Sequence, residues 1–443
     1  MNKVRDIFIG KRFLLYSGVV ILCFALSYAL TILFPIAQGL LILYIILMIA
    51  DLTVIFNAGI SLRANRIMPE VLSLGDDNPV EIEIKNDSEV DLKVDLIDEL
   101  PHQFQTRNLS FEFDLAAQES KTVKHDLRPL TRGEYAFGDI VLYAQSFLSI
   151  FKRRITLSSA KVVNVYPSIM QMKSFELIAF SRVATMSGVK KLRRIGASYE
   201  FEKIKSYVQG DDIRHINWKA TGKRSQLMVN LFEIERSQPI YSVICKSREM
   251  MMPFNGLSLL DYAVNTSLAI SNIALLKHDK MGLITFSDKI GTTLKASSNK
   301  LQLKKILRAL FNEKERETEA NYELLYRSLS TIATQRALLF LFVNFESLYA
   351  LERALPILRR INKRHLLVVV FFRNTEIEQY AKNDPEDLRE IYQKTIATKL
   401  NQEKATIVAK LRQTKIQTVL TTPEDLSMDT INKYLELKSR GAV

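Results

Sequence analysis

Cysteine and histidine are both scarce in this chain of 443 residues. The two cysteines exclude a disulfide framework and any cysteine-rich zinc module. The five histidines lie far apart and none belongs to an HExxH pattern, which argues against metalloprotease chemistry. The chain also lacks a complete phosphate-binding loop, a GxSxG elbow and a GxGxxG fingerprint. The sequence therefore carries no signature of an ATPase of its own.

Glycine and proline are also few, with 15 and 11 residues, which excludes collagen-like and low-complexity chains. The length and a hydrophobic content of 47% predict two or three folded units. Acidic residues are outnumbered, since 61 basic and 48 acidic side chains give a formal charge of +13. Such an excess suits an anionic membrane surface or a nucleic acid. Because no compact stretch alternates basic residues with aromatics, we expect the membrane and no nucleic acid.

Two long apolar runs open the sequence. Phe13–Phe34 has 22 residues and no charge, and Ile36–Phe56 has 21 residues with Asp51 as its single charge. Each is long enough to cross a hydrocarbon core of roughly 30 Å as a helix. Pro35 divides them, which predicts a tight helical hairpin and not a cleaved signal peptide. Asp51 faces the partner helix or lies near the membrane interface, and its place close to the end of the run favours the interface.

Basic residues flank this predicted hairpin on its outer sides, whereas the turn between the runs has no charge. These residues are Lys3, Arg5, Lys11 and Arg12 before the first run, and Arg63 and Arg66 after the second. The positive-inside rule places both ends of the hairpin on the cytoplasmic side. We therefore expect a multi-pass protein of the bacterial inner membrane, with residues 1–60 as the anchor and the folded domains in the cytoplasm.

Residues 61–166 predict an all-β domain. The stretches Glu81–Lys85, Lys93–Ile97 and Leu109–Phe113 alternate apolar and polar side chains with period two. Several short strands at this spacing favour a small immunoglobulin-like β-sandwich. The pattern weakens over residues 167–238, which we expect to be a linker. Its basic cluster Lys190–Arg194 is either a solvated face or a contact with anionic lipid headgroups.

Strands and helices alternate over residues 239–443. Ala337–Val343 and His365–Phe372 are continuous apolar runs, which are typical of central parallel strands covered by helices on both faces. Ile240–Cys245, Met281–Phe286 and Ile416–Leu420 supply further strands, with helical stretches between them. The sequence thus predicts a doubly wound α/β domain after the β-sandwich.

The segment just before this domain, residues 207–223, reads YVQGDDIRHINWKATGK. Together with Arg132-Gly133 ahead of a strand, it resembles the bacterial family called domain of unknown function 58. The resemblance implies a membrane hairpin, a β domain, this motif and a von Willebrand factor A-like domain, in that order. It also implies association with MoxR-type AAA+ ATPases and with other von Willebrand A-like membrane proteins. The motif residues it singles out are Gly210, Asp211, Asp212, Arg214, Asn217, Trp218 and Lys219.

Three interpretations of this motif remain open. In the first, Asp211 or Asp212 forms a salt bridge with Arg214 above a packed Trp218 and locks the sandwich to the α/β domain. In the second, the motif is an anion site or docks a partner. In the third, the two aspartates act as paired catalytic carboxylates or metal ligands. Adjacent residues of a strand point to opposite faces, so the third interpretation has the least support.

The resemblance also suggests where a metal could bind. Metal-binding von Willebrand A domains carry Asp-x-Ser-x-Ser after the first strand, because hard oxygen ligands suit Mg²⁺. Here the matching stretch is Cys245–Glu249, and only Ser247 fits the pattern. Asn344 takes the place of an acidic ligand after the fourth strand. We therefore expect no metal and no cofactor, although Glu249 or Glu346 could supply a weaker Mg²⁺ site.

Cys245 has two interpretations of its own. Lys246 and Arg248 could lower the pKa of its thiol and make it nucleophilic. Catalysis would also need a positioned base, and no histidine is placed nearby by the sequence. We expect Cys245 to be a small buried residue.

These observations together predict a scaffold or adaptor that is anchored in the membrane. It would act by contact with other proteins, through a MoxR-type ATPase system, in the assembly or maturation of envelope or stress-related complexes. The alternative is a hydrolytic or metal-dependent enzyme that uses Asp211 and Asp212.

Overall fold

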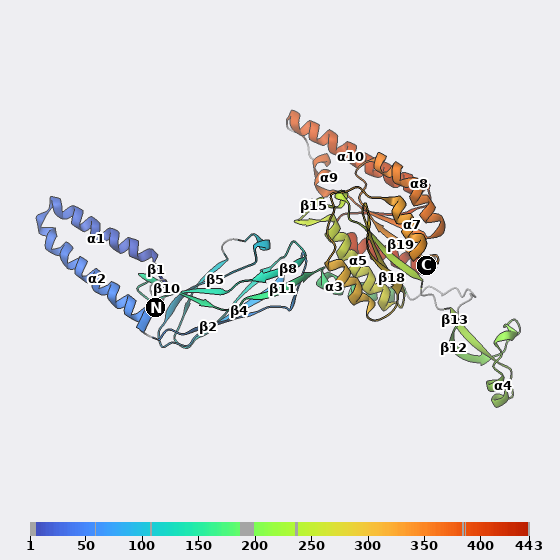
Figure 1. Cartoon of the computed structure of the whole chain (residues 1–443), viewed down its shortest axis with the longest axis horizontal. Helices are drawn as coiled ribbons and strands as arrows, with labels where there is room; N and C mark the ends of the chain where they lie inside the picture. Colours follow the sequence, from blue (N-terminus) through green and yellow to red (C-terminus); the bar gives the residue numbers. More distant parts are fainter. Residues whose placement is uncertain are drawn as a thin grey trace. The chain divides into compact units, whose positions relative to one another are not determined.

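The computed structural model describes residues 6–57, 59–106, 109–186, 199–234, 238–382, 385 and 387–441. The chain forms two compact units, Met1–Ser168 and Ile169–Val443 (Figure 1). Lys3, Arg5 and the basic cluster Lys190–Arg194 lie outside the described residues.

The two apolar runs form the helices α1 (Lys11–Ala29) and α2 (Phe34–Asn57), joined by the 3-10 turn η1 (Thr31–Leu33). Pro35 lies in the first turn of α2, where a missing backbone N–H is tolerated, so it opens the second helix. Both helices are long and apolar enough to cross a membrane, and most of their surface is exposed. They are candidate membrane anchors. The helix α5 (Leu259–Leu276) also meets this length and hydropathy, but 83% of it is buried inside the second unit, as expected of a core helix.

Asp51 joins the end of α2 to the β domain. Its carboxylate is buried and accepts hydrogen bonds from the Ser146 hydroxyl and from the backbone N–H groups of Ile150 (3.1 Å) and Phe151 (2.8 Å). On the other side of the hairpin, Gly10 donates its N–H to the Ile150 carbonyl (2.8 Å). The loop between the strands β9 (Ile140–Gln145) and β10 (Phe151–Leu157) is thus bonded to α2 and to the residue that caps α1.

The β domain contains eleven strands among the residues described. They are β1 (Ile7–Ile9), β2 (Leu62–Ile67), β3 (Val71–Ser73), β4 (Asn78–Asn86), β5 (Leu92–Asp98), β6 (Ser110–Leu115), β7 (Ser120–Leu127), β8 (Gly133–Phe137), β9 (Ile140–Gln145), β10 (Phe151–Leu157) and β11 (Lys161–Tyr166), with a 3-10 turn η2 (His102–Phe104). Three sheets result, with the orders β1-β10-β9-β5-β6, β2-β4-β7 and β3-β11-β8. The first strand of the chain therefore pairs antiparallel with β10, which follows both apolar helices.

The core of this domain lies between two of these sheets. The period-two pattern turns Ile82 and Ile84 of β4 toward Val94 and Leu96 of β5 and Leu142 of β9, all of them buried. Two sheets that share one apolar core form a β-sandwich.

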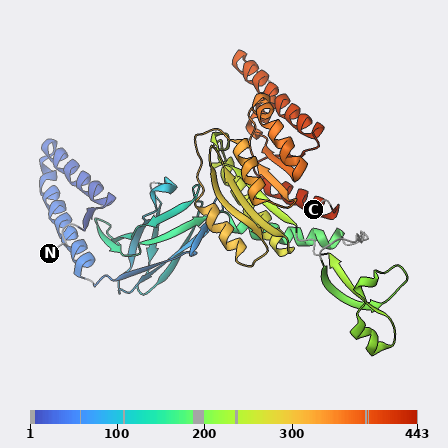
Figure 2. The same cartoon turned by 45° about the vertical axis from the view of Figure 1, so that its right-hand side comes forward.

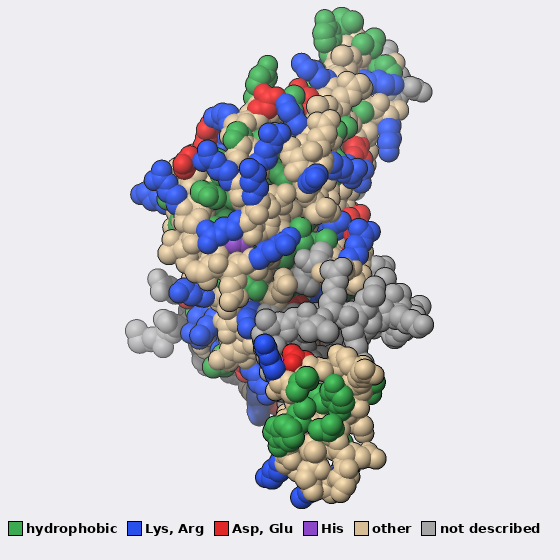
Figure 3. All heavy atoms as spheres, turned by 90° about the vertical axis from the view of Figure 1, so that its right-hand side faces the viewer, with side chains coloured by type: hydrophobic (Ala, Val, Ile, Leu, Met, Phe, Trp, Pro, Cys, Tyr) green, Lys and Arg blue, Asp and Glu red, His purple; other side chains and the backbone are tan. Residues whose placement is uncertain are grey.

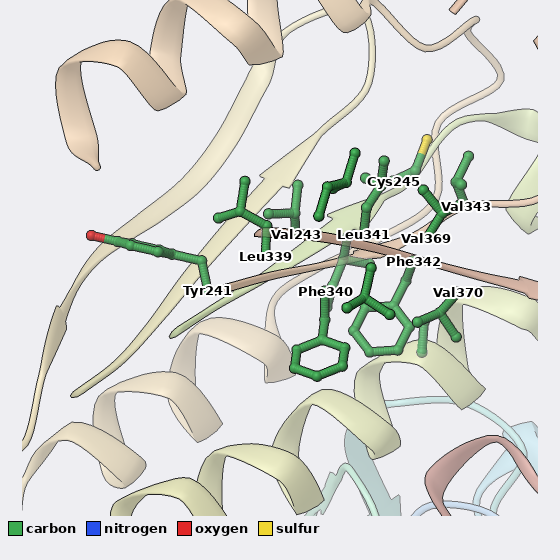
Figure 4. Close-up of a cluster of buried hydrophobic side chains, with 14 of the residues drawn as sticks. Tyr241, Val243, Cys245, Leu339, Phe340, Leu341, Phe342, Val343, Val369 and Val370 are labelled. Atoms are coloured by element: carbon green, nitrogen blue, oxygen red, sulfur yellow. The ribbon is translucent and has the colours of Figure 1, made fainter. Parts of the chain in front are cut away.

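The second unit is built on a six-stranded sheet with the order β18-β17-β14-β19-β20-β21. Its strands are β14 (Pro239–Cys245), β17 (Lys280–Phe286), β18 (Ile290–Ser297), β19 (Leu338–Phe342), β20 (Leu366–Phe372) and β21 (Gln417–Thr421). All neighbours are parallel except β18, which runs antiparallel at the edge. In Figure 4, Phe340 and Phe342 of β19 extend from one face of the sheet toward the helices below it. Both side chains are fully buried, as the continuous apolar run predicts.

Helices cover both faces of this sheet (Figures 1 and 2). One layer contains α3 (Ile169–Met186), α5, α6 (Gln302–Phe311) and α11 (Leu426–Ser439). The other contains α7 (Tyr322–Ile332), α8 (Leu348–Arg364) and α10 (Leu388–Gln413). The remaining short elements of this domain are η4 (Arg248–Met250), β15 (Pro253–Phe254), β16 (Leu257–Ser258) and α9 (Thr375–Lys382). The domain is thus α/β and doubly wound.

The segment 167–238, expected to be a linker with a motif, holds more structure than its pattern indicates. The helix α3 packs on α5, with Met172 and Phe175 against the core of the α/β domain. A hairpin of β12 (Tyr199–Ser206) and β13 (Met228–Ile234) follows, and its connection contains η3 (Ile213–His215) and α4 (Trp218–Arg224). We call residues 199–234 the motif lobe, because every motif residue lies in it.

Candidate functional site

Turns and caps hold the motif lobe together. Gly210 has a φ of +110°, which favours glycine, and it lets the chain turn sharply after β12. Asn217 caps α4, since its side-chain oxygen accepts the N–H of Ala220 (2.9 Å) while its amide donates to Asn230 of β13 (2.8 Å). Thr221 accepts the N–H of Met228 (3.0 Å). These bonds fix the connection onto its own hairpin.

The two motif aspartates form different hydrogen bonds. Asp211 accepts from the Lys205 ammonium (2.7 Å) and from the Val208 N–H (3.0 Å), and these bonds hold the pKa of its carboxyl below the usual range. Asp212 accepts the N–H of Arg214 (3.0 Å) and so caps the short turn η3. Each carboxylate accepts a backbone N–H in a separate turn, and this arrangement gives no support to a paired catalytic site.

Trp218 is not buried. Its side chain is 71% exposed, so the interpretation in which it packs beneath a salt bridge is wrong. Asp211 forms an ion pair with Lys205 and not with Arg214. Ile213 and Val208 are also exposed, at 69% and 62%. Figure 3 shows hydrophobic side chains gathered on the face of the lobe that is turned toward the viewer. The exposed residues of the lobe also include the basic Arg214, Lys219, Lys223 and Arg224.

The second group of predicted residues lies at the carboxyl ends of β14 and β19. Cys245 is fully buried at the end of β14, and its sulfur lies 3.1 Å from the Ser247 hydroxyl. Burial raises the pKa of the Cys245 thiol to about 11, so it is protonated at neutral pH and is a poor nucleophile. The prediction of a small buried residue is confirmed. Asn344 is also buried, and its amide donates to the Glu249 carbonyl (3.3 Å).

A lysine that the sequence analysis did not single out reaches the same place. Lys404 of α10 donates from its ammonium to the Asn344 side-chain oxygen (2.8 Å) and to the Phe345 carbonyl (2.7 Å). Burial lowers its pKa to about 8, an effect that the nearby Glu346 and Glu249 oppose. The lysine lies 60 residues from Asn344 in the chain, so no local pattern could have linked the two. Its positive charge stands beside the oxygen atoms that a metal ion would need.

Glu249 and Tyr322 have buried polar atoms that form no hydrogen bond with the described residues. These atoms are Oε2 of Glu249 and the hydroxyl of Tyr322. Burial, helped by the negative charge of Glu346, raises the pKa of Glu249 to about 7. Burial likewise raises the pKa of Tyr322 well above its usual value. Among the described residues, no three His, Cys, Asp or Glu side chains are grouped as a metal would require.

The comparison with protein families identifies the resemblance. Residues 203–412 match the model of the family described as protein of unknown function DUF58, which confirms the predicted resemblance. A second match is YeaD of Bacillus subtilis (strain 168), described as uncharacterized, which is 24% identical over 124 residues. The match covers 28% of this chain and 31% of YeaD, so it spans about a third of that relative.

Two solved structures are similar over about a quarter of the chain. PapD-like domain 7 of human CEP192 is 14% identical, with 25% of this chain and 87% of that domain covered and a TM-score of 0.19. The CARDB domain of a Pyrococcus furiosus protein, solved with di-metal ions, is 17% identical, with 24% and 93% covered and a TM-score of 0.17. TM-scores of this size carry no argument about fold or function.

Proposed function

We propose, from the DUF58 match of residues 203–412, that the chain is a membrane-anchored adaptor whose motif lobe docks a partner protein. The observation that carries this proposal is the exposure of Trp218, Ile213 and Val208 on one small lobe. Exposed apolar side chains of this size mark interaction surfaces when they gather in one place. Tryptophan and arginine are also the residues that most often dominate binding at protein interfaces, and Arg214 lies beside this group in the chain.

The hydrogen bonds of the lobe support docking and not catalysis. Asp211, Asp212 and Asn217 each hold a backbone turn, so the exposed side chains are carried by a connection with fixed geometry. A surface that is ordered before it binds loses less entropy on binding. An enzyme with Asp211 and Asp212 as its working carboxylates would need both groups free to face one substrate. The adaptor is therefore the better proposal.

The location follows from the candidate membrane helices. Pairing of β1 with β10 supports a hairpin whose two ends lie on the same side of the bilayer, because one strand precedes α1 and the other follows α2. The basic residues Lys11 and Arg12 before α1, and Arg63 and Arg66 after α2, favour the cytoplasmic side. We place the anchor in the bacterial inner membrane with both units in the cytoplasm.

The resemblance suggests the partner. We take the β-sandwich as immunoglobulin-like and the α/β domain as von Willebrand A-like, and the partner as a MoxR-type AAA+ ATPase. Other von Willebrand A-like membrane proteins would belong to the same assembly. Together these proteins would act in the assembly or maturation of envelope or stress-related complexes.

The experiment is a crosslinking pull-down from native membranes with the full chain. Trp218→Ser is compared with Leu388→Ser, a matched control on α10 whose side chain is also 71% exposed. We expect recovery of an AAA+ ATPase to fall at least tenfold in Trp218→Ser, because truncation of a central aromatic anchor costs about 2 kcal/mol or more, and to be unchanged in Leu388→Ser. Equal recovery in both variants, or no ATPase with the wild type, would contradict the proposal.

A further inference from the structure

A cavity of about 440 Å³ opens in the α/β domain beside Glu249, Tyr322 and Phe345. Its position follows from the order of the strands. From β14 the chain passes to β17, which lies on one side of β14 in the sheet, and later to β19, which lies on the other side of β14. Ligands of open α/β sheets bind at such a reversal, outside the carboxyl ends of the strands. Glu249 lies shortly after β14, and Phe345 lies shortly after β19.

Two polar atoms in the lining of the cavity have no partner among the described residues. They are the Glu249 carboxylate oxygen Oε2 and the Tyr322 hydroxyl; both atoms are buried, and they belong to side chains of residues that line the cavity. A buried polar atom without a hydrogen bond is costly for the folded state, and such atoms are rare in native proteins. A ligand that donates hydrogen bonds would satisfy the carboxylate, and the hydroxyl can either donate or accept.

Most of the charged side chains that line the cavity are negative. Four carboxylates and a single guanidinium, that of Arg353, line the cavity. Three of the carboxylates have cationic partners: Glu319 with Arg353 (3.4 Å), Asp288 with Arg316 (3.3 Å) and Glu323 with Arg327 (3.6 Å). Glu249 has no ion pair of this kind among the described residues. Glu249 is therefore the carboxylate of the lining that has no ion pair with a described residue.

Apart from Asn321, the rest of the lining is apolar. Ala350, Ala354 and Ile357 of α8 stand with Ala320 and Phe345 around the cavity. A ligand that fills it therefore combines an apolar stem with a charged end. This combination describes the side chains of lysine and arginine, whose aliphatic stems pack on apolar surface.

We propose that this cavity binds an alkyl cation, an ammonium or guanidinium group on an apolar stem, with the Glu249 carboxylate as its counter-ion and the Tyr322 hydroxyl as a second contact. The lysine or arginine side chain of a partner protein and a free alkylamine share this chemistry. The site is separate from the motif lobe, so it goes beyond the docking function proposed above.

The neighbouring charges exclude other ligands. Lys404 gives its hydrogen bonds to Asn344 and Phe345 and not to Glu249, and at a given distance its ammonium repels a divalent metal about twice as strongly as a single positive charge. An anion would meet the carboxylates of Glu249, Glu319 and Glu323. A single positive charge that reaches Glu249 from the open side is what the site can accept.

Calorimetry with the full chain in detergent micelles tests the site directly. The probes are n-butylguanidinium, its neutral isostere n-butylurea, Nα-acetyl-arginine amide, Mg²⁺ and inorganic phosphate. We expect the two guanidinium probes to bind and butylurea, Mg²⁺ and phosphate not to. Glu249→Gln should weaken the guanidinium probes at least tenfold, and Tyr322→Phe by a smaller factor. Glu352→Gln, on α8 outside the cavity and paired with Lys410, is the control and should bind as the wild type does.

The two guanidinium probes also distinguish the sources of the ligand. Tighter binding of the acetylated amino acid by tenfold or more indicates a protein side chain, and equal binding indicates that a free amine suffices. Both results support the proposal. The proposal is overturned if neither guanidinium probe binds at millimolar concentration, if butylurea binds as well as the cation, or if Glu249→Gln binds as the wild type does. Binding of Mg²⁺ or phosphate in place of the cations overturns it as well.

A pH series adds a readout that a purely structural role of Glu249 would not change. The cation needs the ionised carboxylate, and the pKa of Glu249 is raised to about 7 with Glu346, Glu319, Arg248 and Arg353 around it and Lys404 nearby. The ionised fraction at pH 6 is roughly a tenth of that at pH 8, so affinity should fall roughly tenfold over this interval. In Glu249→Gln the residual affinity should not depend on pH over the same range.

Discussion

Asp51 and Glu249 are two carboxylates withdrawn from water in different units of the molecule, and their surroundings differ in one respect. Asp51, at the end of α2, accepts hydrogen bonds from a hydroxyl and two backbone N–H groups. Glu249, after β14, keeps one carboxylate oxygen without any donor from the described residues. A buried carboxylate whose acceptors are all used fastens parts of the fold together. A buried carboxylate with an oxygen that accepts no hydrogen bond destabilises the fold and remains able to bind a ligand.

Removing the satisfied carboxylate should have the largest effect. Asp51→Leu leaves the Ser146 hydroxyl and the N–H groups of Ile150 and Phe151 without an acceptor, at a cost of about 1–3 kcal/mol for each group. Hydrogen exchange of residues 146–153, measured by mass spectrometry on the full chain in detergent, should accelerate at least 100-fold. Asp51→Asn retains one acceptor and should have a smaller effect. Unchanged exchange in Asp51→Leu would show that the loop is held by other contacts.

Removing the carboxylate of Glu249 should have the opposite effect, because it should stabilise the fold. The pKa of Glu249 is raised from about 4.5 to about 7 in the folded state, so the wild type loses stability as the pH rises from the first value to the second. Glu249→Gln does not titrate, and it should be more stable than the wild type above pH 7 by about 1–2 kcal/mol, because solvent screening of the partly exposed side chain reduces the effect of the shift, with the difference vanishing below about pH 4.5. Urea unfolding of the α/β domain at pH 5 and pH 8 measures this. A less stable variant at pH 8 would mean that Glu249 is held by a partner after all.

The exposed carboxylate of Asp212 should have the smallest effect. Its side chain caps η3 at the surface, and asparagine caps a helical turn about as well as aspartate does. Asp212→Asn should therefore change the free energy of unfolding by less than about 0.5 kcal/mol. Hydrogen exchange of β12 and β13 provides the measurement, with Asp211→Asn, which loses the Lys205 ion pair, as the comparison. A loss above 2 kcal/mol would restore the structural salt-bridge interpretation of the motif.

Local patterns were sufficient to predict the long apolar elements. The uncharged run Phe13–Phe34 and the apolar run Ala337–Val343 predicted a candidate membrane helix and a central strand, because length and hydropathy decide both. The helix α3 was missed, although Met172 and Phe175 have the spacing of a helix face that packs on the core.

The surroundings of single side chains could not be predicted in the same way. Asp51 is bonded to residues 95 to 100 positions away. Lys404 reaches Asn344 only because α10 crosses the end of β19. One interpretation of the motif packed Trp218 beneath a salt bridge, whereas its side chain is 71% exposed in the structure. Each of these is a tertiary arrangement with no counterpart in the local sequence.

The pairing of β1 with β10 has a consequence for the order in which the chain folds during its synthesis. β1 leaves the ribosome before both apolar helices, whereas its partner is made after them and after most of the β domain. Contacts between segments so far apart in the chain form late in folding, so the sheet closes only once the helices have emerged. The last step in closing this sheet then adds β1, a strand that precedes both helices in the chain. A hairpin bonded at both ends to one sheet cannot rotate about either helix axis, so the direction of the two helices fixes the direction of the β domain.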